Sequence, residues 1–283
     1  MKKQRKKRLL IFFATIISLI FFFYFQNNWI ETTDISINTD RVPASFDGYK
    51  IVQLSDLHSK SYGENQDVIV QKVSEVNPNL IVFTGDLVDS KKYNKETSLT
   101  LMKELIQIAP VYFVTGNHEW WSGKFSSLEE SLLDIGVKVM RNTADSITLG
   151  NESIQIIGID DPALAGDGID ERSITEEAII NAMEGVGEGR FNILLSHRPE
   201  LFSLYSKYSI DVVLSGHAHG GQFRMPFVGG LIAPNQGLFP KFTAGKHVSE
   251  NTAMIVNRGL GNSIIPLRIF NRPEIVVLTL KTP

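Results

Sequence analysis

The sequence contains no cysteine, and it has a surplus of basic residues only at its start. Without cysteine the chain can form neither disulfides nor thiolate and iron–sulfur sites. Six of the 28 lysines and arginines lie in residues 2–8, and the rest of the chain carries 22 basic against 31 acidic side chains, a balance of −9. This charge argues against nucleic acid as a partner.

Charged residues are also missing from residues 9–25, an apolar run that reaches the lower length limit for spanning a bilayer. Tyr24 and Trp29 stand where an aromatic interface belt would place them, and the basic cluster should stay cytoplasmic. A cleaved signal peptide begins in the same way, but no small-residue cleavage site follows Phe25. We therefore predict a single-pass membrane protein with a basic cytoplasmic tail at 1–8, an anchor at 9–25, a tether and edge strand at 26–47, and an extracytoplasmic domain at 48–283.

Five short motifs rich in oxygen and nitrogen ligands each follow a strand-like apolar segment. In chain order they are Asp56-Leu57-His58, Gly85-Asp86-Leu87-Val88-Asp89, Gly116-Asn117-His118-Glu119, Ser196-His197 and Gly216-His217-Ala218-His219. Open α/β sheets bind ligands outside the carboxyl ends of their strands, so we expect the motifs to meet at one rim. Any one motif alone could equally be a turn or a helix cap. Together they offer carboxylate, imidazole and amide ligands, which suit Mn, Fe, Zn, Co or Ni better than Ca or Mg.

The order D-x-H, G-D-x-x-D, G-N-H-[DE], H and G-H-x-H resembles that of the calcineurin-like metallophosphoesterases, and the resemblance covers roughly residues 48–280. Three segments look like a branch of membrane-associated or secreted bacterial phosphodiesterases related to a UDP-2,3-diacylglucosamine pyrophosphatase. They are Gly216-His217-Ala218-His219-Gly220-Gly221-Gln222, Gly158-Ile159-Asp160-Asp161-Pro162 and Asn257-Arg258-Gly259-Leu260-Gly261. The resemblance implies that residues 48–283 form the catalytic domain, with the four-layer α/β/β/α sandwich of that family.

The resemblance also implies a site for two divalent metal ions, for which we expect manganese, with Fe, Zn, Co or Ni as alternatives. One ion would be held by Asp56, His58, Asp86 and His219, and the other by Asp86, Asn117, His197 and His217. Asp86 would bridge them, because a carboxylate offers two anionic oxygens. Such a pair can activate a water as hydroxide and neutralise charge on phosphate oxygens, so the reaction implied is hydrolysis of a phosphate ester.

Two further residues are catalytic by the same resemblance. His118 would protonate or hydrogen-bond the leaving oxygen, and Asp89 would orient the His118 side chain. The alternatives are a helix cap for Asp89 and a structural role beside the metals for His118. Protein Ser/Thr phosphatases of the superfamily follow Gly-Asp-x-x-Asp with a phosphate-clamping arginine, whereas this chain has Ser90. A phosphodiester or pyrophosphate is therefore expected as substrate.

Periodicity predicts the remaining elements. Residues 32–39 indicate an edge strand, and the three ranges 65–76, 95–109 and 127–135 indicate crossover helices. Strands are expected at 137–140, 146–149 and 153–159, a helix at 175–184, a long functional loop at 220–250, and two strands at 253–257 and 275–280 that close a second sheet.

Aromatic side chains near the motifs bear on the substrate. Trp120 and Trp121 follow the third motif, and the loop at 220–250 adds Phe223, Met225, Phe227, Phe239 and Phe242. They could form an apolar lip that admits a lipid tail, or simply pack the loops against the domain. A lipid-linked substrate is expected on the first alternative. A nucleotide phosphodiesterase or nuclease is the chemical alternative, and a metal-free scaffold on the same fold is disfavoured by the intact ligand set.

Overall fold

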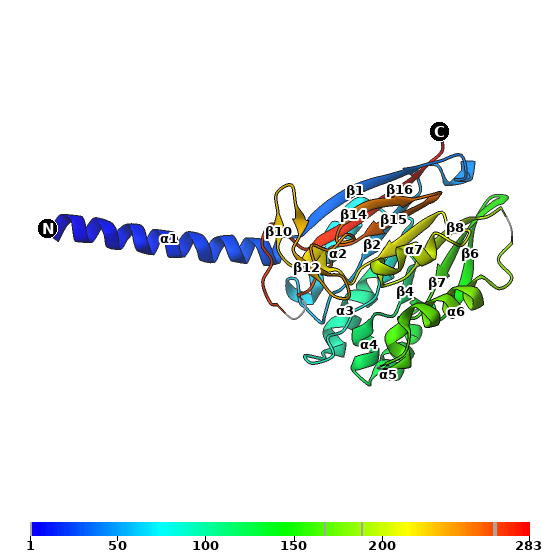
Figure 1. Cartoon of the computed structure of the whole chain (residues 1–283), viewed down its shortest axis with the longest axis horizontal. Helices are drawn as coiled ribbons and strands as arrows, with labels where there is room; N and C mark the ends of the chain where they lie inside the picture. Colours follow the sequence, from blue (N-terminus) through cyan, green and yellow to red (C-terminus); the bar gives the residue numbers. More distant parts are fainter. Residues whose placement is uncertain (1, 167, 188, 263–264) are drawn as a thin grey trace.

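A computed structural model of the chain describes residues 2–166, 168–187, 189–262 and 265–283. Two six-stranded sheets form the body of the molecule (Figure 1). The first contains, in spatial order, β1 (Glu31–Asn38), β16 (Glu274–Lys281), β2 (Lys50–Leu54), β3 (Leu80–Thr84), β4 (Val111–Val114) and β5 (Lys138–Val139). The second contains β14 (Gly245–Ser249), β15 (Thr252–Val256), β9 (Val212–Ser215), β8 (Phe191–Leu195), β7 (Glu152–Gly158) and β6 (Thr143–Leu149).

Three layers of buried apolar side chains separate four layers of structure. Along β3, Leu80 and Val82 pack between the two sheets, while Ile81 and Phe83 face the helices on the outer side of the first sheet. A third apolar cluster lies between the second sheet and its own helices. These alternating faces are the pattern of strands buried on both sides. The α/β/β/α sandwich is therefore confirmed.

The helices that cover the outer faces of the sheets are α2 (Asp67–Val76), α3 (Lys95–Leu105), α4 (Asn117–Trp121), α5 (Phe125–Asp134), α6 (Glu171–Met183) and α7 (Phe202–Tyr205). Of these, α2, α3 and α5 are the three predicted crossover helices, with ends shifted by a few residues. Asn94 caps α3 by accepting a hydrogen bond from the backbone N–H of Thr97. The short helix α4, which begins at Asn117 within the third motif, was not predicted from the sequence.

Two of the sequence expectations about strands were wrong. The strand expected at 275–280 is β16, and it lies in the first sheet between β1 and β2 instead of closing the second. The loop expected at 220–250 ends in β14, which pairs antiparallel with β15 and forms the edge of the second sheet. The edge strand predicted at 32–39 is β1, as expected.

The N-terminal helix α1 (Lys2–Asn28) projects from the body and is the one helix of the described residues that is long and apolar enough to cross a membrane (Figure 1). Its last turn is docked on the domain, and the side chains of Gln26 and Asn27 are buried there. Because β1 begins at Glu31, only two residues separate helix and sheet. The helix therefore continues through the start of the segment that was predicted to be a tether.

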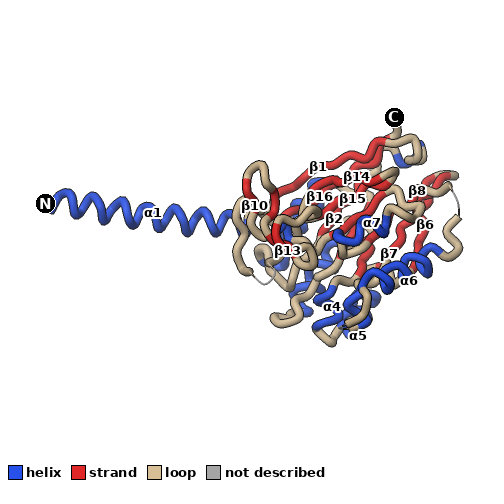
Figure 2. The backbone as a smooth tube through the Cα atoms, in the orientation of Figure 1, coloured by secondary structure: helices blue, strands red, loops and turns tan. Residues whose placement is uncertain are grey.

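The segment after β9 forms two small hairpins beside the base of α1 (Figure 2). They consist of β10 (Arg224–Met225) with β11 (Gly229–Gly230), and β12 (Ile232–Ala233) with β13 (Gly237–Leu238). Of the aromatic residues noted in the sequence, Phe223 and Phe242 are half-buried, whereas Phe227 and Phe239 are exposed. Packing thus accounts for only part of this aromatic set.

Candidate metal centre

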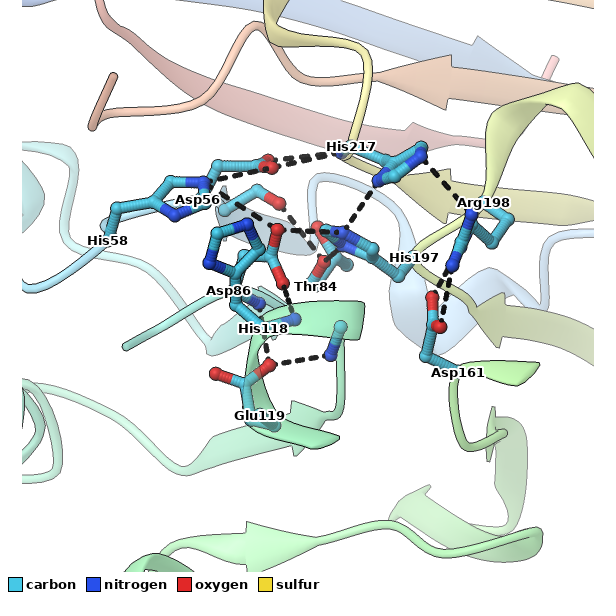
Figure 3. Close-up of polar contacts among 12 residues, drawn as sticks. Asp56, His58, Thr84, Asp86, His118, Glu119, Asp161, His197, Arg198 and His217 are labelled. Atoms are coloured by element: carbon cyan, nitrogen blue, oxygen red, sulfur yellow. Dashed lines mark hydrogen bonds and ion pairs between the residues drawn. The ribbon is translucent and has the colours of Figure 1, made fainter. Parts of the chain in front are cut away.

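Side chains from all five motifs converge at the carboxyl ends of β2, β3, β4, β8 and β9 (Figure 3). Three groups of side chains among the described residues could hold a metal ion, and within each group the potential ligand atoms lie within 4.8 Å of one another. The first group is Asp56, His58, Asp86 and His219, the second is Asp86, His197 and His217, and the third is His58, Asp89 and His118. Asp86 belongs to the first two. The structure therefore brings together six of the seven residues expected to bind metal, in the two sets expected for them.

The distances within these groups are those of ligands that share a cation. Asp86 Oδ2 lies 3.2 Å from His197 Nε2 and 3.6 Å from His58 Nε2. His58 Nε2 is 3.0 Å from His219 Nε2, and His217 Nδ1 is 3.2 Å from His197 Nε2. Neighbouring ligands around one ion are typically about 3 Å apart, because each bond to the ion is close to 2 Å.

Asn117, the seventh expected ligand, begins α4 beside this cluster. Its side chain is buried, and its Oδ1 has no hydrogen-bond partner among the described residues. The next residue, His118, donates its backbone N–H to Asp86 Oδ1 at 2.8 Å, so α4 starts against the shared carboxylate. A buried amide oxygen without a partner is costly, and a cation would satisfy it.

Two glycines let the loops approach this closely. A Cβ on Gly216 would lie 1.9 Å from Ser55 Oγ and 2.4 Å from Asp56 Oδ2. Gly85 has a φ of +88°, and a Cβ there would lie 2.7 Å from the backbone N of Gly116. A larger residue at either position would push the loops that carry the ligands apart.

Five of the expected ligands have left-handed backbone conformations. Their φ values are 52° for Asp56, 49° for His58, 54° for Asp86, 64° for His217 and 46° for His219. A residue with a Cβ pays about 1 kcal/mol or more for this conformation, and such residues cluster at functional sites. The fold therefore holds the ligands in place against a local cost.

The charges of the site fit divalent cations. Burial lowers the pKa of His197, but the Asp86 carboxylate outweighs that effect and raises it to about 10. Burial raises the pKa of Asp56, and Asp86 raises it further. Two buried carboxylates among imidazoles create a negative potential, which either protons or metal ions can neutralise. The donor set is thus compatible with two divalent ions.

His118 lies beside the cluster, and its ring accepts a hydrogen bond. The backbone N–H of Ser90 donates to His118 Nδ1 at 3.0 Å, so the neutral ring carries its proton on Nε2. Burial lowers the pKa of His118, which also favours the neutral ring. Asp89 Oδ2 is 3.8 Å from His118 Nδ1, beyond hydrogen-bond distance, and 3.6 Å from His58 Nδ1. The Ser90 amide therefore occupies the position that was expected for Asp89.

Glu119 has a structural role that the sequence did not predict. Its Oε2 accepts hydrogen bonds from the backbone N–H groups of Asp86 at 2.8 Å and Gly116 at 2.7 Å, and its Oε1 accepts one from Val88 at 3.1 Å. This carboxylate is fully buried and joins the second motif to the third. The feature of the sequence that could have indicated this role is the acidic residue at the fourth position of Gly-Asn-His-Glu.

The sequence also did not predict a buried charge pair beside the cluster. Arg198 forms two hydrogen bonds with Asp161, at 2.6 and 2.9 Å, and its Nη1 lies 3.3 Å from His217 Nε2. Both carboxylate oxygens of Glu200 are buried without a hydrogen-bond partner among the described residues, and Oε1 lies 3.6 Å from Arg198 Nη1 and 3.8 Å from His217 Nε2. Burial raises the pKa of Glu200 to about 7. The feature of the sequence that could have indicated this group is the pair of charged residues next to the histidine in Ser196-His197-Arg198-Pro199-Glu200.

The cluster is joined to the N-terminal helix by a short hydrogen-bonded path. Gln26 Oε1 accepts the backbone N–H of Asn271 at 3.3 Å, and Asn271 Nδ2 donates to the backbone oxygen of His219 at 2.7 Å. Asn27 adds further contacts, since its backbone oxygen accepts from Lys60 Nζ. One residue thus separates the end of α1 from a residue of the metal centre.

Comparison with known proteins identifies the class. The family model for calcineurin-like phosphoesterases matches residues 49–221, so the chain belongs to this family. It is 34% identical over 259 residues to an uncharacterized metallophosphoesterase, YkuE of Bacillus subtilis, covering 89% of this chain and 86% of that protein. It is 30% identical to a transmembrane protein with metallophosphoesterase domain from Danio rerio, covering 89% of this chain and 57% of that protein.

Solved structures agree on the fold. The sulfate thiohydrolase SoxB of Thermus thermophilus superposes with a TM-score of 0.53 at 12% identity, covering 85% of this chain and 57% of that one. At this identity the likeness concerns the fold alone. By family, the chain is a metal-dependent phosphoester hydrolase, and its Asp and His cluster is compatible with a dimetal site. The apolar helix α1 and the relatives named as transmembrane proteins indicate a membrane protein.

Proposed function

We propose that this chain is a membrane-anchored dinuclear-metal hydrolase that cleaves a lipid-linked phosphodiester or pyrophosphate. The observation that carries the proposal is the pair of ligand groups that share Asp86. In this proposal the ligands are Asp56, His58, Asp86 and His219 for one ion, and Asp86, Asn117, His197 and His217 for the other. When bound, the two ions, for which manganese remains our first expectation, would acidify a water and offset charge on the phosphate oxygens.

The other residues position the substrate and the ligands. His118 Nε2–H is free to donate to the leaving oxygen, because the Ser90 amide occupies Nδ1. We assign His118 this hydrogen bond in preference to full proton transfer, since a neutral imidazole is a poor acid. Asp89 would orient His58, whose Nδ1 faces its carboxylate.

The charges near the site support a diester over a monoester. A phosphomonoester dianion is usually clamped by a free arginine. Arg198 is buried beside His217, but the Asp161 carboxylate already neutralises its charge through two hydrogen bonds. The residue after the second motif is Ser90, and its backbone is engaged with His118. A phosphodiester or pyrophosphate, which carries less charge on the attacked phosphorus, suits this arrangement.

The anchoring supports a substrate at the membrane. In the proposal, residues 1–8 are a cytoplasmic tail, 9–25 span the bilayer, and the catalytic domain is extracytoplasmic, following the positive-inside rule. Because Asn271 links Gln26 to His219, the centre must work close to the headgroups. A lipid-linked phosphate, such as a lipid pyrophosphate, is the substrate class that this position favours. A nucleotide diester is the competing substrate class.

Metal dependence and substrate class can be tested together on the full chain in detergent. The chelated protein should lose hydrolysis of bis(para-nitrophenyl) phosphate, Mn²⁺ should restore it, and para-nitrophenyl phosphate should be cleaved more slowly. Asp86→Asn should abolish the activity, while Asp134→Asn, at an exposed position, serves as the matched control. Full activity after chelation would overturn the metal assignment, and faster cleavage of the monoester would overturn the diester assignment.

A further inference from the structure

We propose that the β10–β11 hairpin dips its tip into the same bilayer that α1 spans, and so forms a second membrane contact next to the metal centre. This inference deepens the proposed function and rests on the proposed anchoring by α1. The occupant of this surface is the outer headgroup and acyl boundary of that membrane. The hairpin tip consists of Met225, Pro226, Phe227 and Val228.

The hairpin tip is apolar and exposed. Phe227 is fully exposed, and Met225 and Val228 expose 42% and 55% of their surface. Residues 224–229 and Phe270 line one shallow hollow, and Phe270 itself exposes 59%. Adjacent exposed apolar side chains of this size mark an interaction surface, whereas single ones do not. An aqueous position would leave the whole group in contact with water.

The position of the hairpin along α1 indicates that the partner of this surface is the bilayer. The ring of Phe270 packs against that of Phe22, with centroids 5.7 Å apart. Phe22 lies three residues inside the apolar run 9–25, which at about 1.5 Å per residue is roughly 5 Å below the end of that run. The hollow shared by Phe270 and the hairpin therefore lies beside membrane-spanning sequence, as Figures 1 and 2 place β10 at the base of α1.

The length of the apolar run brings the hairpin closer to the lipid. Residues 9–25 are about 26 Å long as a helix, while the hydrocarbon core of a bilayer is about 30 Å thick. A short span draws the flanking residues toward the bilayer or thins it locally. On the outer side the flanking surface includes the hairpin with Phe270, and also Arg272, whose guanidinium lies 5.4 Å from the centre of the Phe25 ring. Apolar side chains there can enter the interface without losing polar contacts.

The hairpin is also packed on the metal centre. Its base residue Gly230 lies so close to Gly221 that a Cβ on Gly221 would be 2.4 Å from Gly230 Cα. Gly221 follows the expected ligand His219 by two residues. A lipid headgroup held at the hairpin would therefore be presented beside the cluster. This gives the proposed lipid-linked substrate a route that does not require it to leave the bilayer.

The absence of cysteine allows a direct depth measurement on the full chain. Phe227→Cys, Phe13→Cys and Leu133→Cys would each carry one nitroxide label in vesicles of phosphatidylcholine and phosphatidylglycerol. Phe13 is in the middle of α1, and Leu133 is an exposed apolar residue of α5 that serves as the control. The label at 227 should lie about 5–10 Å below the phosphates, the depth of interfacial segments. The label at 13 should be deeper, and the label at 133 should be in water.

A rate measurement tests the consequence for substrate. Phe227→Ser should lower cleavage of a dioleoylglycerol para-nitrophenyl phosphodiester in these vesicles by about tenfold, the scale set by burial of one phenylalanine side chain. The rate on soluble bis(para-nitrophenyl) phosphate should not change. Leu133→Ser is the matched control and should alter neither rate.

The outcomes separate this inference from the proposed function. A label at 227 in water, with the label at 13 in the bilayer, overturns the hairpin contact and leaves the hydrolase unaffected. A label at 13 in water overturns the anchoring and the hairpin contact together. Dipolar broadening at 227 without bilayer depth would mean that a second copy covers the hairpin, which also overturns the inference. Failure of the wild type to cleave either diester contradicts the proposed function regardless of label depth.

Discussion

Replacing Glu119 by glutamine tests how the central loops of the metal centre are held. The carboxylate accepts three backbone hydrogen bonds, from Asp86, Gly116 and Val88. Glutamine has the same shape but only one acceptor oxygen. If that oxygen takes the Oε2 position, the amide NH2 must face the N–H of Val88, and two donors are then in contact.

The expected loss can be worked from these three bonds. A buried donor left without a partner costs about 1–3 kcal/mol, and two charge-assisted bonds that become neutral lose about 1 kcal/mol each. The variant should therefore be destabilised by about 3 kcal/mol or more. For a domain of this size that lowers the melting temperature by at least roughly 6 °C.

The prediction depends on Glu119 being ionised. Burial and, next, the nearby Asp86 carboxylate raise the pKa of Glu119, the three backbone N–H groups lower it, and the net result is a pKa of about 8. Divalent ions at Asp86 would also favour the carboxylate, because they are the largest local charges. A neutral Glu119 would resemble glutamine, so the substitution would then have little effect.

Thermal unfolding of the full chain in detergent, with and without Mn²⁺, measures the effect. Metal affinity should fall about tenfold or more, because the two loops that carry Asp86 and Asn117 lose their shared partner. Glu130→Gln, at an exposed position, is the control and should melt with the wild type. A melting temperature of Glu119→Gln within about 1–2 °C of the wild type, with unchanged metal affinity, would refute the reasoning.

Four further substitutions give distinct outcomes. Asn117→Ala should lower occupancy of one metal in elemental analysis, whereas His118→Ala should keep both metals and slow turnover by roughly 100-fold, the scale for losing one positioned donor. Asp89→Asn should weaken metal binding at His58 about tenfold in chelator competition, and an unchanged affinity would contradict its orienting role. Burial, with Arg268 nearby, lowers the pKa of Lys60 to about 7 from 10.5. The unfolded state therefore binds more protons between these values, and stability should rise with pH there by up to about 1.4 kcal/mol per unit. Lys60→Met should flatten that rise in thermal unfolding.

The sequence predicted where the expected ligands lie, because the strands that precede them can be recognised from local sequence patterns. Each motif follows a short apolar segment, and parallel strands bring their carboxyl ends to one edge. This reasoning placed Asp56, Asp86 and His197 in one cluster, and the structure agrees. This reasoning required no knowledge of which strands pair, since both sheets place the carboxyl ends of these strands at the site.

Pairing between distant strands could not be predicted in the same way. β16 and β15 are both buried apolar strands, and periodicity gives them the same pattern. The difference lies in their neighbours, because β16 pairs with β1 and β2 while β15 pairs with β9. The docking of α1 was hidden for the same reason. Gln26 was read as the start of a tether, and its partner Asn271 lies 245 residues away.

The strain at the ligands belongs to the part that only the structure reveals, and it bears on how metal and fold depend on each other. In the sequence, Asp56 and His217 were residues of turns after strands, whereas in the structure they have φ values of 52° and 64°. At about 1 kcal/mol or more for each of five such residues, the site opposes folding by roughly 5 kcal/mol or more, a large share of the net stability of a domain. The tight glycine contacts and the Glu119 bonds hold these conformations before any ion binds.

Because ions bind the folded site and not the unfolded chain, they should add stability in proportion to the logarithm of their concentration over the dissociation constant. The melting temperature of the chelated protein should therefore rise with added Mn²⁺, and Asp86→Asn, which removes the shared ligand, should abolish most of that rise. A rise of equal size in both proteins would mean that the strained loops are not where the metal binds.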